Sequence, residues 1–378
     1  MAYVLFFGAI ALNLACIFCK KQNKTIALIS LTMILLVMGF ANVNYGDLEI
    51  YYTHYKSSNF KLSRFEPGYI FINLFFAKIG LNFNQFRIIV FLLCSVLLLL
   101  ATKSITKNYN MVILLYTLCM SYLMGVALRY FIAFSIIIFG ASLLLKRRKI
   151  NIIFFVLLVL LAAQFHTSAL FTLSYLLCII PQKFKKHLNI VLLCCSAISI
   201  SLGFYLLMTP NAISQILGLV NSAFAGVLND NINYLSTSYL SGTYSRRYFI
   251  YVIFYLFSFT VSWFAVNTLK KQTSITTHTL DKYTTIALLN LAMSFLVLAS
   301  QTFIRLIFIP LFLGYMIFAK FAEHDDTSPN VLIIGEFQVS LAIRNILFIS
   351  TALTWFIMLY VIGDLGFDLF EFLSNNML

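Results

Sequence analysis

The sequence predicts an all-α integral membrane protein with about 12 transmembrane helices, because of its composition, the length of its apolar runs and the placement of its charges. Of the 378 residues, 61% are hydrophobic and 10% are charged, whereas soluble domains carry about 25% charged residues. The mean hydropathy is +0.94. The net charge of +14 lies in short clusters between the apolar runs, a pattern that orients a membrane protein and does not indicate nucleic-acid binding.

The apolar runs give the order of the predicted helices, most of them about long enough to cross a hydrocarbon core of about 30 Å. The predicted spans are 2–19, 26–43, 86–101, 111–126, 131–145, 150–164, 167–180, 188–208, 249–269, 283–300, 303–319 and 346–362. No fixed-period repeat appears. Residues 1–378 are expected to form a single polytopic membrane domain.

Basic residues gather between alternate spans and thereby predict the orientation. If crossings alternate, the inner loops are 20–25, 102–110, 146–149, 181–187, 270–282 and 320–345. These loops hold 17 of the 26 Lys and Arg residues but five of the 12 acidic residues, as expected for the cytoplasmic side. The first lysines follow the first apolar run, so the N-terminus is not expected to be a cleavable signal peptide. Both termini are then predicted to lie on the outer side.

One outer segment, 44–85, departs from the pattern of simple crossing helices. Pro67 suits the first turn of a helix, and Glu66 just before it would face the positive end of that helix. The apolar stretch that follows is too short to cross a bilayer. A short re-entrant or interfacial helix is therefore predicted near 67–79.

A second departure is a broken hairpin at 150–180, hinged at Gln164-Phe165-His166-Thr167. Each arm has about fourteen residues, or about 21 Å as an α-helix, which is shorter than the hydrocarbon core. The hinge is therefore expected below the outer surface, where non-helical backbone is tolerated only inside protein or beside water. His166 is expected to point into a polar cavity.

The longest predicted outer loop is 209–248, and its second half is polar and aromatic. Aromatic faces stack on sugar rings, and guanidinium groups bind acidic ligands. Its candidate glycan-binding residues are Tyr234, Tyr239, Tyr244, Arg246 and Arg247. The tyrosines could equally form an aromatic belt at the membrane interface, and the arginines could pair with lipid head groups or acidic residues.

Two arginines stand at the outer ends of predicted spans. Arg129 ends MGVALRYF, and Arg305 lies in SQTFIRLIF. A guanidinium stays charged and offers a planar fork to phosphate oxygens. The pair therefore predicts a site for a lipid diphosphate or another acidic ligand. The alternative is that both arginines serve lipid head groups or pair with Asp47, Glu66 or Asp230.

Three further residues could carry catalysis on the same side. His166 is a candidate general base or a hydrogen-bond donor to phosphate, or else a packed interior histidine. Asp47 and Glu66 are candidate bases for a sugar hydroxyl, or they hold the arginines in place. The sequence does not separate these roles.

No metal or nucleotide site is predicted. The five histidines lack the HxxxH and HExxH spacings of zinc sites, and neither a Walker loop nor a GxGxxG loop is present. Asp325 and Asp326 lie in a polar inner loop, where a solvated pair of charges is the simpler interpretation. No cofactor is expected.

Five motifs resemble the EpsG family of polysaccharide polymerases, a branch of the Wzy-type O-antigen polymerases. The matching stretches are YGDLEIYY with Asp47 and Tyr51, FEPGYIFIN, ALRYFIAFSI, LAAQFHTSAL and FIRLIFIPLF. Together they extend from residue 47 to about residue 310. One departure is Tyr130, since many members of the family have Gln after this arginine. It bears on details of the site rather than on the family.

The resemblance implies a glycosyltransferase that acts on the periplasmic face of a bacterial inner membrane. The outer loop 209–248 and both termini would then be periplasmic. Such enzymes move a growing glycan from undecaprenyl diphosphate onto a lipid-linked repeat unit, as in O-antigen or lipopolysaccharide biosynthesis. On this basis Arg129 and Arg305 bind the diphosphate, His166 acts at the same site, and Asp47 or Glu66 activates the acceptor. The implied partners are the lipid-linked oligosaccharide, membrane lipids and a separate chain-length regulator.

Three other functions compete with this interpretation. A transporter or flippase of lipid-linked glycans often has twelve spans, but two similar halves joined by a long inner loop are typical of such carriers. A membrane O-acyltransferase of surface sugars would use outer arginine and histidine and take an acyl donor from inside. A scaffold subunit of an export complex is the third.

Overall fold

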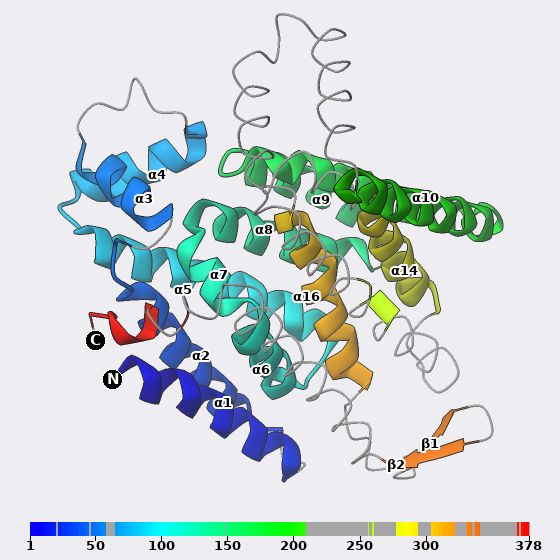
Figure 1. Cartoon of the computed structure of the whole chain (residues 1–378), viewed down its shortest axis with the longest axis horizontal. Coiled ribbons are helices and arrows are strands. Elements are labelled where there is room, and N and C mark those ends of the chain that lie inside the picture. Colours follow the sequence, from blue (N-terminus) through cyan, green and yellow to red (C-terminus); the bar gives the residue numbers. More distant parts are fainter. Residues whose placement is uncertain are drawn as a thin grey trace, which may run out of the picture.

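The computed structural model is helical in nearly all of the part of the chain that it describes (Figure 1). That part comprises residues 1–19, 22–44, 47–57, 65–146, 148–208, 277–293, 304–321, 331–334, 337–340 and 372–377, with Leu256, Phe259, Thr260 and Leu369. The two ends of the chain lie next to each other (Figure 1). The Met377 N–H donates to the Phe40 carbonyl at 3.0 Å, which ties the C-terminal segment to the end of α2.

The first two helices form an antiparallel hairpin of α1 (Ala2–Phe18) and α2 (Lys24–Gly39). The Asn23 side chain caps α2 by accepting from the Thr25 and Ile26 N–H groups. At the other end of α2, the fully buried Arg87 donates to the carbonyl oxygens of Met38 and Ala41. A guanidinium at this end complements the negative end of the helix dipole.

The outer segment contains two short helices, α3 (Asp47–Lys56) and α4 (Pro67–Lys78). The second confirms the predicted short helix near 67–79, with Pro67 at its start. The sequence analysis did not predict α3, because its polar and aromatic residues lack an apolar run. The chain then turns at Gly80, which has a φ of 82°, a conformation that favours glycine.

The centre of the bundle consists of α5 (Phe83–Ile105), α6 (Tyr109–Cys119), α7 (Ser121–Val126) and α8 (Leu128–Leu144). The prediction of one continuous helix over 111–126 is wrong, because the helix breaks at Met120. Beside this break, the Ser121 hydroxyl donates to the Thr117 carbonyl oxygen at 2.7 Å. Helix α8 packs between α5 and α9.

The predicted broken hairpin is confirmed, but its second arm differs from the expected α-helix. The first arm, α9 (Ile150–Ala163), is an α-helix, and the second, η2 (Thr167–Ile179), is a 3₁₀ helix. Hydroxyls reinforce the tighter winding, since Thr172 donates to the Ala169 carbonyl at 2.6 Å and Ser174 to that of Phe171 at 2.7 Å. A 3₁₀ helix rises about 2.0 Å per residue and an α-helix about 1.5 Å, so the 13 residues of this arm span about 26 Å instead of about 20 Å.

Three long helices and a small hairpin complete the described part. Helix α10 (Gln182–Met208) begins inside the predicted inner loop 181–187 and packs against α14 (Thr277–Ala292). Helix α16 (Ile304–Phe321) contains Pro310 and contacts α14, α6 and α8. Strands β1 (Val331–Ile334) and β2 (Phe337–Ser340) pair antiparallel, within the predicted inner loop 320–345.

Contacts between loops agree with the predicted alternation of crossings. The loops predicted to be inside touch one another, since the Asn23 N–H donates to Asn110 at 2.9 Å and the Lys282 ammonium donates to the Leu144 and Lys146 carbonyls. By length and composition, Phe83–Ile105 and Gln182–Leu202 are long and apolar enough to cross a membrane, and several shorter apolar helices accompany them. The count of twelve spans stays a prediction, because most of 249–269 and all of 346–362 lie outside the described residues.

Candidate functional site

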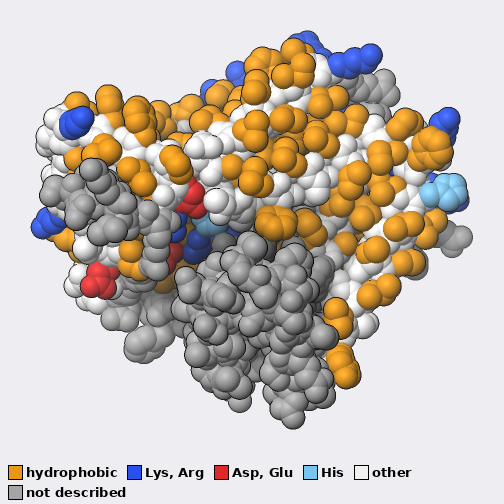
Figure 2. All heavy atoms as spheres, turned by 90° about the horizontal axis from the view of Figure 1, so that it is seen from above, with side chains coloured by type: hydrophobic (Ala, Val, Ile, Leu, Met, Phe, Trp, Pro, Cys, Tyr) orange, Lys and Arg blue, Asp and Glu red, His pale blue; other side chains and the backbone are white. Residues whose placement is uncertain are grey.

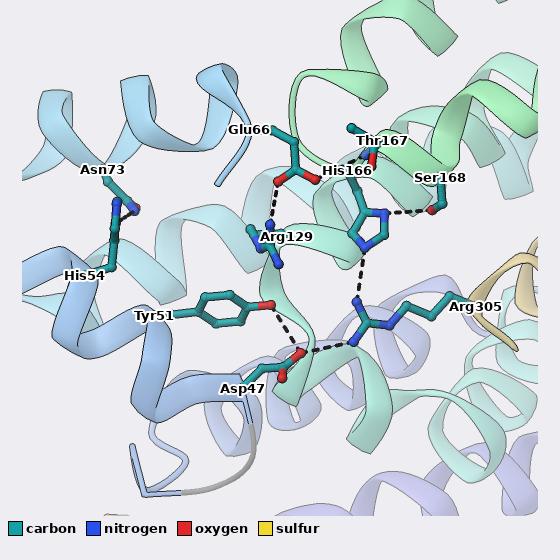
Figure 3. A network of polar contacts seen from close by, with 10 residues as sticks. All are labelled: Asp47, Tyr51, His54, Glu66, Asn73, Arg129, His166, Thr167, Ser168 and Arg305. Carbon is teal, nitrogen blue, oxygen red and sulfur yellow. Dashed lines mark hydrogen bonds and ion pairs between the residues drawn. The ribbon is translucent and has the colours of Figure 1, made fainter. Parts of the chain in front are cut away.

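Five predicted residues meet at one end of the bundle, although they come from distant parts of the chain (Figure 3). Asp47 begins α3, Glu66 precedes α4, Arg129 lies in the first turn of α8, His166 occupies the α9–η2 hinge, and Arg305 lies in the first turn of α16. Figure 2, which views this end, shows acidic, basic and histidine side chains close together at this end of the molecule.

Arg305 joins the two sides of the site. Its Nη2 donates to Asp47 Oδ2 at 3.0 Å, and its Nη1 lies 3.1 Å from His166 Nε2. Its side chain is 25% exposed and that of Asp47 is 40% exposed, so both remain accessible from outside. The Tyr130 ring lies beneath, 5.8 Å from the guanidinium carbon, and its hydroxyl donates to the Arg305 carbonyl.

The contacts of His166 define its proton arrangement. A guanidinium can only donate, so Nε2 must accept from Arg305 and the ring proton must reside on Nδ1. Nδ1 lies 2.7 Å from the Ser168 hydroxyl, which then accepts from it. The imidazole is thus neutral in this arrangement. It is also buried, with 4% of the residue exposed, so the expectation that it faces an open polar cavity is wrong: its polar neighbours are side chains.

Arg129 is held by a second ion pair. Its Nη1 lies 2.5 Å from Glu66 Oε2, and the two side chains are 17% and 11% exposed. The guanidinium also stacks on the Phe65 ring at 4.4 Å and lies 5.6 Å from the Tyr51 ring. Arg129 is therefore more enclosed than Arg305. Removing one partner of a fully buried pair typically costs about 3–5 kcal/mol, and this partly buried pair should cost less.

Glu66 connects the start of α4 to the hinge. It occupies the N-cap position of α4, the positive end of that helix, as expected, but its side chain makes no capping hydrogen bond there. Its Oε1 instead accepts from the Thr167 N–H at 3.2 Å. At the start of α4, the Gln164 carbonyl oxygen accepts hydrogen bonds from the N–H groups of Gly68 at 2.9 Å and Tyr69 at 3.3 Å. These contacts fix the FEPGY motif against the hinge that carries His166.

Tyr51 connects the two ion pairs. It lies one turn after Asp47 on α3, and its hydroxyl donates to Asp47 Oδ2 at 3.4 Å. Its ring is buried against Phe65 and Tyr69 and faces the Arg129 guanidinium. Nearby on α3, burial and then the charge of Arg129 lower the pKa of His54, whose ring packs edge-on against Phe65 at 4.6 Å.

The remaining predicted residues lie outside the described part of the chain. They are Tyr234, Tyr239, Tyr244, Arg246 and Arg247 of the outer loop, with Asp230, Asp325 and Asp326. Their assigned roles stay predictions. Within the described residues, no group of three His, Cys, Asp or Glu side chains could hold a metal ion.

Sequence reasoning missed three residues that shape the site. They are Gly68, Tyr130 and Ser168. Gly68 and Ser168 stand within the quoted motifs beside Glu66 and His166, so the motifs themselves were the available signal. Tyr130 was noted only as a departure from the family pattern, although its buried ring touches both His166 and Arg305.

A comparison with models of known protein families shows the family to which the chain belongs. The model of the EpsG family matches residues 24–360, which include all five residues of the site. The chain belongs to the EpsG family. This family includes polymerase-like proteins of the Wzy type, and membership identifies a membrane protein of polysaccharide biosynthesis. Neither a curated protein nor a solved structure matches the chain.

Proposed function

We propose that this EpsG family protein is a membrane glycosyltransferase that polymerises oligosaccharide repeat units carried on undecaprenyl diphosphate. The contact of Arg305 with both Asp47 and His166 carries the proposal. A cation that can bind a phosphate lies beside a carboxylate that can accept a proton from a hydroxyl, and this pairing supports glycosyl transfer from a diphosphate.

The donor half of the site consists of the two arginines. Cleavage of the anomeric C–O bond leaves negative charge on the diphosphate, and a preorganised guanidinium stabilises that charge. Arg305 is the more exposed of the two and is assigned to direct phosphate contact. Arg129 is held by Glu66 and Phe65 and contributes its charge from the next layer.

The setting of the site supports an outward-facing reaction. The site lies at the end of the bundle where the predicted outer segments meet, opposite the basic loops. The proposal places this end in the periplasm of a bacterial inner membrane, with both termini on the same side and twelve crossings. The loop residues Tyr234, Tyr239, Tyr244, Arg246 and Arg247 are proposed to grip the glycan, and a chain-length regulator is a proposed partner.

Incubation of the purified, reconstituted protein with the lipid-linked repeat unit alone tests the function. A polymerase lengthens the glycan, whereas a flippase, an O-acyltransferase or a scaffold subunit does not. A product that stays at one repeat unit with active, folded protein would contradict the proposal.

Arginine variants test the assignment of the site. Arg305→Ala and Arg129→Ala are each expected to leave lipid that carries one repeat unit, since loss of one such donor lowers the rate about 10²–10³-fold. Because Arg129→Ala strands the Glu66 carboxylate, it is paired with Glu66→Gln to preserve folding. Arg148→Ala, at an exposed position among the basic loops, is the matched control. Normal chain lengths in both variants at normal protein level would refute the assignment.

A further inference from the structure

The site holds three candidate bases for the acceptor hydroxyl, and their contacts distinguish them. Glu66 is fully engaged, because one carboxylate oxygen binds Arg129 and the other accepts from the Thr167 N–H. Its side chain is 11% exposed. A proton taken up by Glu66 would break a buried ion pair and loosen the hinge. This geometry suits a residue that positions the site.

His166 is also engaged on both nitrogens. Nε2 accepts from Arg305, and the Nδ1 proton is directed to Ser168. A second proton on Nε2 would place an imidazolium directly against a guanidinium. With 4% of the residue exposed, an acceptor sugar would also have to displace its neighbours. His166 therefore positions Arg305.

Asp47 differs from both. Its side chain is the most exposed of the four in the two ion pairs, at 40%. Its Oδ2 accepts from Arg305 and from Tyr51, whereas Oδ1 makes no hydrogen bond to any residue that the structure describes. In Figure 3 this second oxygen points away from Arg305. Asp47 can therefore reach an acceptor hydroxyl without dismantling the protein around it.

The resting site is electrically balanced, which gives Arg305 a second role. Two guanidinium groups face two carboxylates, and His166 is neutral. A diphosphate that arrives at Arg305 therefore competes with Asp47 for the same cation.

Building on the proposed function, we propose that Asp47 is the catalytic base. In the resting site Arg305 is paired with Asp47, and the base becomes free when the donor diphosphate binds Arg305 in its place. The acceptor O–H then gives its proton to Asp47, and the oxygen forms a bond to the anomeric carbon of the donor sugar. The anomeric C–O bond to phosphate breaks, and its electron pair leaves with the undecaprenyl diphosphate. Asp47 later returns the proton to solvent, and Arg305 pairs with it again.

This arrangement predicts an unusual separation of binding from catalysis. Loss of the Asp47 charge should strengthen donor binding, because Arg305 is released from its partner, while polymerisation is lost. A partly exposed ion pair of this kind contributes up to about 1 kcal/mol, which corresponds to about two- to fivefold in affinity. Loss of a general base lowers the rate about 10²–10⁴-fold.

The experiment measures both quantities on the full-length protein in lipid nanodiscs. Binding of undecaprenyl diphosphate and elongation of the lipid-linked repeat unit are compared for wild type, Asp47→Asn and Asp47→Ser. Asn and Ser are both well accommodated at helix starts, so α3 should form in each variant. Glu49→Gln is the matched control, since it removes the same charge from an exposed position on the same helix.

Tighter binding by both Asp47 variants with elongation reduced at least about 100-fold, and an unchanged Glu49 variant, would support the inference. Weaker binding in both variants would overturn it, because Asp47 would then help to hold the donor. Elongation at more than a tenth of the wild-type rate would also overturn it. Failure of the wild type itself to elongate the repeat unit would instead refute the proposed function.

Discussion

The junction between α4 and the α9–η2 hinge offers a sharp test of how this site is built. The N–H groups of Gly68 and Tyr69 both donate to the Gln164 carbonyl, two residues before His166. A Cβ at position 68 would lie 2.7 Å from that carbonyl oxygen and 2.7 Å from the Gln164 Cβ. Ordinary contact begins near 3.4 Å. Gly68→Ala must therefore move the start of α4 away from the hinge.

The size of the effect follows from the contacts that this movement breaks. Each of the two hydrogen bonds contributes about 0.5–1.5 kcal/mol, so local stability should fall by about 1–3 kcal/mol. Amide exchange at residues 66–70 and 164–168 should then accelerate by about 5- to 150-fold, because 1.4 kcal/mol corresponds to a factor of ten. Since Glu66 and His166 separate, elongation of the repeat unit should fall as well.

A second glycine supplies the control. Gly80 has a φ of 82° with open space around it, so Gly80→Ala introduces backbone strain far from the hinge contacts. It should accelerate exchange near its own turn and leave 164–168 protected. Wild-type exchange rates at the hinge in Gly68→Ala would refute the reasoning.

Three further outcomes are expected. Arg87→Met should lower the yield of folded protein, because the Met38 and Ala41 carbonyl oxygens lose their hydrogen-bond donor. Each buried acceptor left without a donor destabilises the fold by about 1–3 kcal/mol. A wild-type yield would contradict this role. His54 has a folded-state pKa below its ordinary value, so the stability of α3 should fall as pH drops below about 6.5. Amide exchange at residues 47–57 should therefore be faster at about pH 5.5. The His54→Gln variant should not show this acceleration. Chelation should leave elongation unchanged, since the proposed site relies on guanidinium groups; a loss that Mg²⁺ restores would point to a metal-dependent step.

The site in this resting form neutralises its own charges. Arg305 and Arg129 each have a carboxylate partner, and His166 accepts from Arg305 without bearing a charge. Ligand binding must therefore rearrange existing contacts. Arg305 has the more exposed pair and is the one to exchange partners, whereas the enclosed Arg129 pair keeps α4 and the hinge in register.

The sequence by itself determined the features that depend on short stretches of chain. Apolar runs predicted most of the helices, Pro67 located the start of α4, and the polar tetrapeptide at Gln164 located the hinge. Alternating basic loops predicted which ends of the helices lie together, because each charge cluster reports on its own loop. Asp47, Glu66, Arg129, His166 and Arg305 were likewise visible as ionisable residues at the ends of apolar runs.

Only the tertiary structure decided which of these residues touch. Asp47 and Arg305 are 258 residues apart, and Glu66 and Arg129 are 63 apart. Their pairing depends on how α3, α8 and α16 pack, and no local pattern encodes it. The same holds for the neutral state of His166, which follows from the donor that reaches it, and for the 3₁₀ winding of η2, whose residues would also fit an α-helix. Local patterns set what each segment can form, and long-range packing sets the partners on which the chemistry depends.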